Sequence, residues 1–250
     1  MKRWLYPVAL LGALIGLWQL AASSGFMAEV MNLPDFLVPS PAEIASALWD
    51  ERTLLLENGW VTLQEIVLGF LLATVAGVTF AVAMHFSRTI RLAAYPLVVA
   101  SQTIPIIVIS PILVIWFGFG LTPKLLIIAL ICFFPVTVAT VDGLRSVDPA
   151  AIKLMRTLDA SRLQIFLRVE APAALPTFFS GARIAVAVAP IGAVFAEWVG
   201  ANEGLGRLIF IGTANYQVDL TFAAVVVLSA IAIALYALVA LAERRVVTWR

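Results

Sequence analysis

The stretch LAAYPLVVASQTIPIIVISPILVIWFGFGLTP, residues 92–123, decides the fold class, because it runs for 32 residues without a charged side chain. A helix needs about 20 consecutive, mostly apolar residues to cross the hydrocarbon core of a bilayer. This stretch is therefore long enough for a membrane-spanning helix. Its prolines Pro105 and Pro111 each remove a backbone hydrogen bond, so they predict kinks within that helix.

Long apolar stretches recur along the whole chain. Five more cover residues 4–28, 66–87, 125–141, 171–199 and 220–242, and only 171–199 contains charges, Arg183 and Glu197. Hydrophobic residues make up 62% of the 250 residues, above the usual share of about half in globular proteins. We therefore predict an all-α, polytopic membrane protein of about six transmembrane helices, forming a single domain over residues 1–250.

The distribution of Lys and Arg predicts the orientation, since cytoplasmic loops carry an excess of both. The first apolar stretch follows Lys2 and Arg3 as a signal peptide would, but its length and poor cleavage site favour a retained helix. With the N-terminus inside, six spans leave only Arg52, Lys124 and Arg207 of the 16 basic residues outside. The other 13 face the cytoplasm: Lys2, Arg3, Arg88, Arg91, Arg145, Lys153, Arg156, Arg162, Arg168, Arg183, Arg244, Arg245 and Arg250. We expect a cytoplasmic (inner) membrane protein with both termini cytoplasmic.

An outer loop with an amphipathic helix is expected at about residues 29–58. Ser40 before Pro41, with Glu43 three residues after the serine, is the pattern of a helix N-cap with proline at the first position. The amphipathic stretch then runs over residues 42–56. We expect it to lie on the outer surface, ahead of a second span that begins at about residue 66.

A charged segment at about residues 142–172 stands out from the apolar chain. Six charges gather between residues 153 and 170: Lys153, Arg156, Asp159, Arg162, Arg168 and Glu170. Asp148 before Pro149 predicts the start of one helix, over 149–158. Ser161 with Gln164 forms a capping box that predicts a second helix, over 162–170, so Asp159 and Ala160 must turn between the two.

The charged segment also carries large apolar side chains outside the membrane: Leu154, Leu158, Ile165 and Phe166. A plain solvated loop would need neither two capped helices nor these side chains. Both features favour docking of the segment into a groove of a partner protein. The sequence therefore predicts a compact cytoplasmic element that binds another subunit.

Two groups of residues are candidates for lining a translocation pathway. Ser101, Gln102 and Thr103 lie one turn before Pro105, although polar side chains there can also join neighbouring helices. Glu197 and Trp198 end the fifth stretch near the outer face. An acid at that depth is costly unless it is paired or wet, so it favours a functional role over a simple interfacial position.

Several other classes of function are excluded. The net charge of +1 offers no basic face for a nucleic acid. One cysteine, Cys132, and one histidine, His85, provide neither a disulfide nor a metal site. The glycines of residues 117–124 lack the phosphate-loop pattern, so any ATP must be bound by another subunit. We expect no cofactor on this chain.

Five stretches resemble one transporter family in order along the chain, over about residues 34–245: LVPSPAEI, IPIIVISPILVIWFGFG, DGLRSVDP, TLDASRLQIFLRVEAPAALP and GARIAVAVAPIGAVFAEWVGANEGLG. They are similar to binding-protein-dependent ABC importer permeases of the nitrate, taurine and aliphatic-sulfonate family. The resemblance implies a type I importer permease, not itself an enzyme, that forms a homodimer in the lipid bilayer. It also implies two ATPase subunits, which bind ATP and Mg, and an outer solute-binding protein.

Within this resemblance, the charged segment matches the cytoplasmic loop with the Glu-Ala-Ala motif, which couples ATP hydrolysis to transport. The motif falls on Lys153, Leu154 and Met155, and its glycine falls on Asp159. Aspartate enters the left-handed region more readily than most residues, so the turn can survive. The resemblance assigns coupling to Lys153, Met155, Arg156, Leu158, Asp159, Ala160, Ser161, Arg162, Phe166 and Pro172.

The substrate is expected to be a small solute. Glu197, if wet, would repel a sulfonate or nitrate, while Gln102 and Trp198 suit an aromatic heterocycle with hydrogen-bonding groups. The AEWVGANEGLG stretch resembles permeases for thiamine-precursor pyrimidines and riboflavin more than those for sulfonates. A pyrimidine precursor of thiamine is thus expected first, riboflavin next, and a sulfonate, taurine or nitrate as the alternative.

Two rival classes remain open at this point. An ion-coupled secondary transporter would show internal repeats and several ionisable groups within its spans, whereas only Glu197 is a candidate here. An intramembrane enzyme would need a nucleophile with a base or a metal cluster. Co-purification with a separate ATPase subunit would distinguish the importer permease from both.

Overall fold

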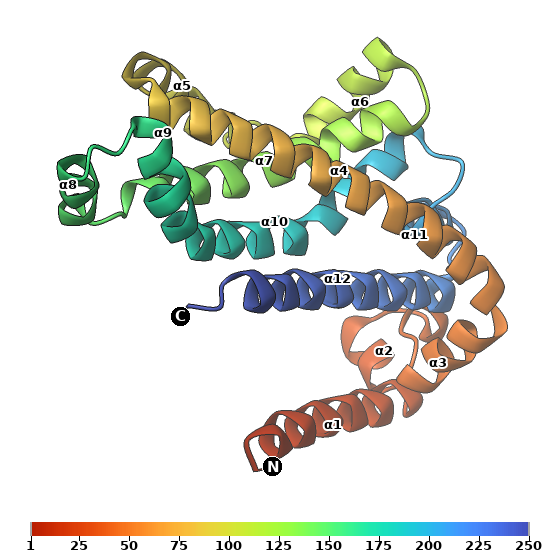
Figure 1. The fold of residues 1–250 in the computed structure, drawn as a ribbon. Coiled ribbons are helices and arrows are strands. Elements are labelled where there is room, and N and C mark those ends of the chain that lie inside the picture. Colours follow the sequence, from red (N-terminus) through yellow and green to blue (C-terminus); the bar gives the residue numbers. More distant parts are fainter. Residues whose placement is uncertain (1, 250) are drawn as a thin grey trace. The chain divides into compact units, whose positions relative to one another are not determined.

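The computed structural model describes residues 2–249, with side chains from residue 6 onward. Three of the basic residues that predict the orientation are therefore not described in full. The side chains of Lys2 and Arg3 and the whole of Arg250 lie outside the described residues. The described chain contains helices and no strand, which confirms the all-α prediction. The helices are α1 (Lys2–Ser23), α2 (Phe26–Met31), α3 (Pro41–Asp50), α4 (Arg52–Phe86), α5 (Arg88–Ser101), α6 (Ile106–Phe117), α7 (Leu121–Arg145), α8 (Pro149–Thr157), α9 (Arg162–Ile165), α10 (Ala171–Gly200), α11 (Leu205–Ala214) and α12 (Val218–Val246), with a 3-10 turn at Asp35–Leu37 and a π-helix at Phe166–Glu170 (Figure 1).

One compact unit consists of the residues up to Val61 together with Glu203–Ser229. The predicted capping box is present at the start of α3, where the Ser40 backbone N–H donates to Glu43 Oε2 at 2.7 Å. This backbone hydrogen bond and a second from the Ser40 hydroxyl lower the pKa of Glu43. In the same unit, Gln19 Oε1 accepts a hydrogen bond from the Ala42 backbone N–H at 2.9 Å. That bond ties α1 to the start of α3.

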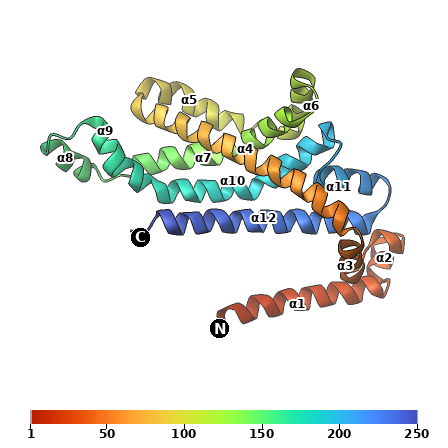
Figure 2. The same cartoon turned by 45° about the vertical axis from the view of Figure 1, so that its right-hand side comes forward.

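The second compact unit comprises Thr62–Asn202 and Ala230–Arg250. Within it, α7 and α10 run side by side in both views (Figure 1 and Figure 2). Gly181 permits this close approach, because a Cβ atom at that position would lie 2.5 Å from the Pro135 carbonyl oxygen. Small residues let membrane helices pack with their backbones near one another. Figure 2 shows α8 and α9 beyond one end of this helix pair.

The number of long apolar helices agrees with the six predicted spans, but the third differs in form. Five helices are long and apolar enough to cross a membrane, and α5 with α6 passes the same test as a pair bent by 103°. The break falls between Ser101 and Ile106, at Pro105, whereas Pro111 lies inside α6. The structure therefore has a broken helix where the sequence predicts a kinked one. Such a break is tolerated where protein or a water-filled cavity satisfies the freed backbone groups.

The predicted bounds were wrong around the second span. The amphipathic helix α3 ends at Asp50 instead of residue 56, and α4 begins at Arg52, well before residue 66. The prediction treated charged residues as limits of a span, but no proline separates Arg52 from the apolar run, and the single glycine between them, Gly59, does not end the helix. The short apolar helix α11 was not predicted, because only long uncharged stretches were counted.

Candidate functional site

The charged segment folds as two short helices with the predicted caps. Asp148 Oδ1 accepts a hydrogen bond from the Ala150 backbone N–H at 2.8 Å at the start of α8. Ser161 Oγ accepts from the Gln164 backbone N–H at 3.3 Å, and Gln164 Oε1 accepts from the Ser161 N–H at 2.8 Å. Both side-chain caps satisfy donors that would otherwise be left open at a helix start.

The turn between α8 and α9 uses the left-handed conformation expected of Asp159, whose φ is +54°. The Ala160 backbone N–H donates to the Met155 carbonyl at 3.0 Å, which closes the end of α8. Hydrogen bonds of this kind across a left-handed residue are the usual way to terminate a helix. The predicted turn at Asp159 and Ala160 is thus confirmed, although the residue is not glycine.

The apolar side chains of the segment divide into two groups. Leu158 is 70% exposed, and Leu154 and Leu163 are exposed as well. Ile165, in contrast, is only 5% exposed, and the Phe166 ring packs on Phe86 with a centroid distance of 5.1 Å. The expectation that Ile165 and Phe166 belong to a free docking face was therefore wrong. Leu163 was not singled out from the sequence, although it lies in the predicted second helix.

The remaining predicted coupling residues lie on or beside the two short helices. Lys153, Arg156, Ser161 and Arg162 are exposed, Met155 and Ala160 are half-buried, and Pro172 is half-buried at the start of α10. The structure thus brings the predicted residues together around one turn. Their exposure is compatible with contact to another protein.

A cavity of about 720 Å³ lies within the second unit, between the α5–α6 break and the helices α7 and α10. Most of its lining is aliphatic. Ser101 and Gln102 contribute from the break, whereas Thr103 and Pro105 do not line it although they belong to the same turn. Its lining residues are Ser101, Gln102, Ile104, Ile106, Ile109, Leu130, Ile131, Phe134, Pro135, Val138, Ala139, Asp142, Thr177, Ser180, Gly181, Ile184 and Val188.

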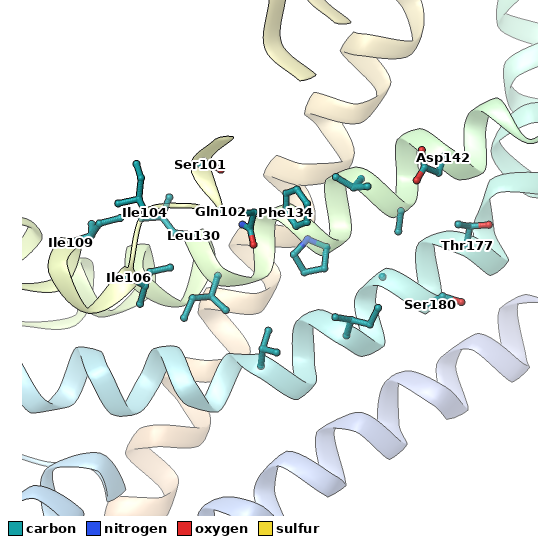
Figure 3. Close-up of a pocket in the computed structure, with 17 residues that line it drawn as sticks. Ser101, Gln102, Ile104, Ile106, Ile109, Leu130, Phe134, Asp142, Thr177 and Ser180 are labelled. Carbon is teal, nitrogen blue, oxygen red and sulfur yellow. The ribbon is translucent and has the colours of Figure 1, made fainter. Parts of the chain in front are cut away.

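Polar groups are few in this cavity, and they sit at different places along it. Figure 3 labels Gln102 and Phe134 among the lining residues, with Asp142, Thr177 and Ser180 farther along. The Ser180 hydroxyl donates to the Pro176 carbonyl of its own helix at 3.0 Å. In the described part of the chain, Gln102 and Asp142 make no side-chain hydrogen bond, so both can meet a solute. Asp142 was not singled out, since it was taken only as the first residue of the charged segment.

Glu197 belongs to the protein interior and does not line the cavity. Its side chain is 0% exposed, and its Oε1 accepts a hydrogen bond from the Thr62 hydroxyl of α4 at 2.7 Å. Of the two possibilities for this acid, paired or wet, the structure shows the paired one, so the repulsion of anions expected of a wet Glu197 does not apply. Trp198 is 37% exposed and packs edge-on against Phe195, with ring centroids 5.4 Å apart.

A buried ion pair joins α4 to the first turn of α7. Lys124 Nζ donates to Glu65 Oε1 at 2.5 Å, and both residues are buried. Lys124 was predicted on the outer side and Glu65 was not singled out, because the two residues are 59 positions apart in the chain. In a second ion pair, Arg183 Nη2 lies 3.3 Å from Glu243 Oε2 of α12. Arg183 is therefore paired within the protein.

The comparison with protein families decides the identity of the chain. The family model described as "Binding-protein-dependent transport system inner membrane component" matches residues 66–248. The chain belongs to this family. This permease is therefore a membrane-embedded subunit of an ABC importer for a small solute. In this family, separate subunits hydrolyse ATP and a binding protein presents the solute, which confirms the family resemblance seen in the sequence.

Curated relatives of the permease span nearly its whole length. A "Probable ABC transporter permease protein" of Haemophilus influenzae is 44% identical, covering 94% of this chain and 93% of that protein. The "Formylaminopyrimidine transport permease protein ThiX" of Halalkalibacterium halodurans is 36% identical over 98% of this chain and 96% of its own. The "Riboflavin transport system permease protein RibX" of Chloroflexus aurantiacus is 37% identical over 97% and 89%.

A solved structure supports the fold of the permease. A chain of the MetNI methionine ABC transporter in an inward-facing conformation superposes with a TM-score of 0.66 at 21% sequence identity. The match covers 80% of this permease and 97% of that chain. At this identity the comparison shows the type I importer permease fold alone.

Proposed function

We propose that two copies of this permease form the transmembrane part of an importer, with two ATPase subunits on the cytoplasmic side and a solute-binding protein outside. Family membership supports the ATPase and the binding protein as partners. The excess of Lys and Arg on one side of the predicted topology supports an inner-membrane location with both termini cytoplasmic. The exposed apolar residues of α6, such as Ile115 and Trp116, suit lipid or a second copy.

The charged segment is the element that we assign to the ATPase interface. Its exposed leucines, Leu154, Leu158 and Leu163, offer apolar contacts, and Arg156 and Arg162 stand exposed around them. Apolar anchors with a charged rim are the usual arrangement of a protein–protein interface. ATP and Mg belong to the partner in this proposal, and the permease itself catalyses no reaction.

The substrate that we favour is a pyrimidine precursor of thiamine, with riboflavin next. The single observation that carries this choice is the cavity, whose mostly aliphatic lining includes both the Gln102 amide and the Phe134 ring (Figure 3). A flat heterocycle can stack on the ring and share hydrogen bonds with the amide. The names of the relatives ThiX and RibX support the same chemical class.

Sulfonate, taurine and nitrate remain the alternative substrates. The alternative of an ion-coupled secondary transporter is excluded, because the chain belongs to the ABC importer permeases. Asp142, rather than the buried Glu197, is the acid that an anionic solute would meet in the cavity. Asp142 is exposed at one end of the cavity, and a carboxylate there disfavours an anionic solute over a neutral one.

Uptake of labelled hydroxymethylpyrimidine tests the substrate. Cells that carry the permease with its ATPase and binding protein are expected to accumulate the label, and cells without the permease are not. Gln102→Leu should reduce uptake by about fivefold, since one lost hydrogen bond is worth about 1 kcal/mol. Equal uptake in both cell types, together with lost growth on a sulfonate as sulfur source, would favour the alternative.

Cysteine labelling tests the orientation. In a variant without Cys132, a probe that does not cross membranes is expected to label a cysteine at Glu57 or Asn202 from outside intact cells. It should label a cysteine at Arg162 only after the cells are opened, because the charged segment faces the cytoplasm. All three positions are exposed in the structure, so burial does not limit labelling. Labelling of Arg162→Cys in intact cells would reverse the proposed topology.

A further inference from the structure

The last two residues of α4 hold the helix that follows the turn of the charged segment. His85 Nε2 lies 2.8 Å from Glu170 Oε2, and the two side chains are 17% and 12% exposed. A carboxylate only accepts hydrogen bonds, so the histidine Nε2 carries the hydrogen in this contact. The pair is largely shielded from water, which makes it stronger than an ion pair or hydrogen bond on the open surface.

Aromatic and cationic contacts reinforce this connection. The Phe166 ring packs on Phe86 and also lies 5.9 Å from the His85 ring. The Arg162 guanidinium stands 5.1 Å over the Phe86 ring, and its Nη2 donates to the Phe86 carbonyl at 3.2 Å. We refer to these five residues, His85, Phe86, Arg162, Phe166 and Glu170, as the α4 latch.

The α4 latch contacts an irregular part of the continuous helix from Arg162 to Gly200. Phe166–Glu170 is a π-helix, and its first and last residues are the two latch residues Phe166 and Glu170. The helical path continues on both sides of it, from Arg162 to Gly200. A π segment is a rare, locally widened turn that is found mostly at functional sites. Here the C-terminal end of α4 contacts both ends of the π-helix.

We propose that the α4 latch is a second route by which movement of the charged segment reaches the membrane, with His85 and Glu170 as its positioning residues. This inference rests on the proposed docking of the charged segment to the ATPase. Displacement of α9 acts on α10 directly, because the two are one continuous helix. The latch makes α4 move with them, since hydrogen bonds, ring contacts and a cation–π contact join the end of α4 to α9 and the π-helix. Without the latch, α9 moves by bending at the π-helix and α4 keeps its position.

The test follows the distance between α4 and α9 in the assembled permease–ATPase complex. Spin labels at Val75 and Leu163, both exposed, report this distance with and without ATP. In the otherwise unchanged permease, the distance distribution is expected to be the same in both states, since the two elements move together. In His85→Ala with Glu170→Ala, ATP is expected to shift or broaden it by about 1–2 Å, the scale of helix shifts in such transitions.

Two further variants separate positioning from stability. The double replacement removes both partners and leaves no unpaired charge, so we expect it to keep the fold. The single replacement His85→Gln keeps Glu170 and offers it an amide donor, so the distance between the labels should again be the same with and without ATP. Thr79→Ala is the matched control, because that hydroxyl bonds only the Val75 carbonyl within α4. An ATP response identical in the latch variant and the control would overturn the latch.

Failure of the latch and failure of the docking proposal give different results. The latch variants are expected to bind the ATPase normally, because Leu154 and Leu158 are unchanged. If they bind normally but show no altered response to ATP, the latch is wrong and docking stands. If permeases altered at Leu158 still bind the ATPase, docking itself is wrong.

Discussion

Aspartate at both Leu158 and Ala160 is expected to reduce ATP-dependent uptake to that of cells without the permease. Leu158 is 70% exposed at the end of α8, next to the turn at Asp159. In the proposed complex it fills an apolar groove, where a carboxylate would be desolvated without a partner. A buried anchor of this kind contributes about 2 kcal/mol or more, so binding of the ATPase should weaken by about thirtyfold or more.

Membrane insertion and thermal stability should change little in this variant, because Leu158 is exposed and Ala160 is only half-buried. Co-purification with the ATPase measures the binding, and labelled hydroxymethylpyrimidine measures the uptake. Normal complex formation by the Leu158 and Ala160 variant would show that the segment is only a solvated loop.

Local signals in the sequence predicted local structure well. The caps at Ser40, Asp148 and Ser161 and the left-handed turn at Asp159 each depend on residues within four positions of one another. Spacing alone was sufficient to predict the caps and a turn at Asp159, and the family resemblance added the left-handed conformation of that residue. The family resemblance then gave the charged segment a role that the caps by themselves could not supply.

Contacts between distant residues were not predictable in the same way. Glu65 and Lys124 are 59 positions apart, and Thr62 and Glu197 are 135 apart. The rule that a charge ends a membrane span failed at Glu65, because its partner lies on another helix. For the same reason the sequence left open whether Glu197 is paired or wet, and Phe166 was assigned to the docking face instead of to Phe86.

The cavity was predicted only in part. The prolines and the neighbouring polar residues indicated an interruption near residue 105, and Ser101 and Gln102 do line the cavity. The angle of 103° between α5 and α6 depends on how both helices pack, which one sequence does not specify. Phe134 and Asp142 join the cavity through the approach of α7 to the break, so no local pattern marked them.

Lys124→Met is expected to destabilise the permease by about 3–5 kcal/mol, the usual cost of removing one partner from a buried ion pair. Glu65 is only 2% exposed, and within the described residues its Oε2 already has no hydrogen-bond partner. Loss of the lysine leaves this carboxylate without its cation in the interior. Thermal unfolding in detergent should show a clearly lower midpoint, and less permease should be recovered from membranes.

The paired replacement Lys124→Met with Glu65→Leu should recover most of this stability, because exchanging a whole buried ion pair for apolar side chains is often neutral or stabilising. Lys153→Met is the matched control, since Lys153 is exposed on α8 and forms no ion pair in the described chain. It should unfold at the same temperature as the unchanged permease. A double variant as unstable as Lys124→Met alone would show that lost packing, rather than the unpaired Glu65 carboxylate, causes the effect. Recovery of stability without recovery of uptake would give the pair a separate role in transport, because only the charges would then differ between two equally stable permeases.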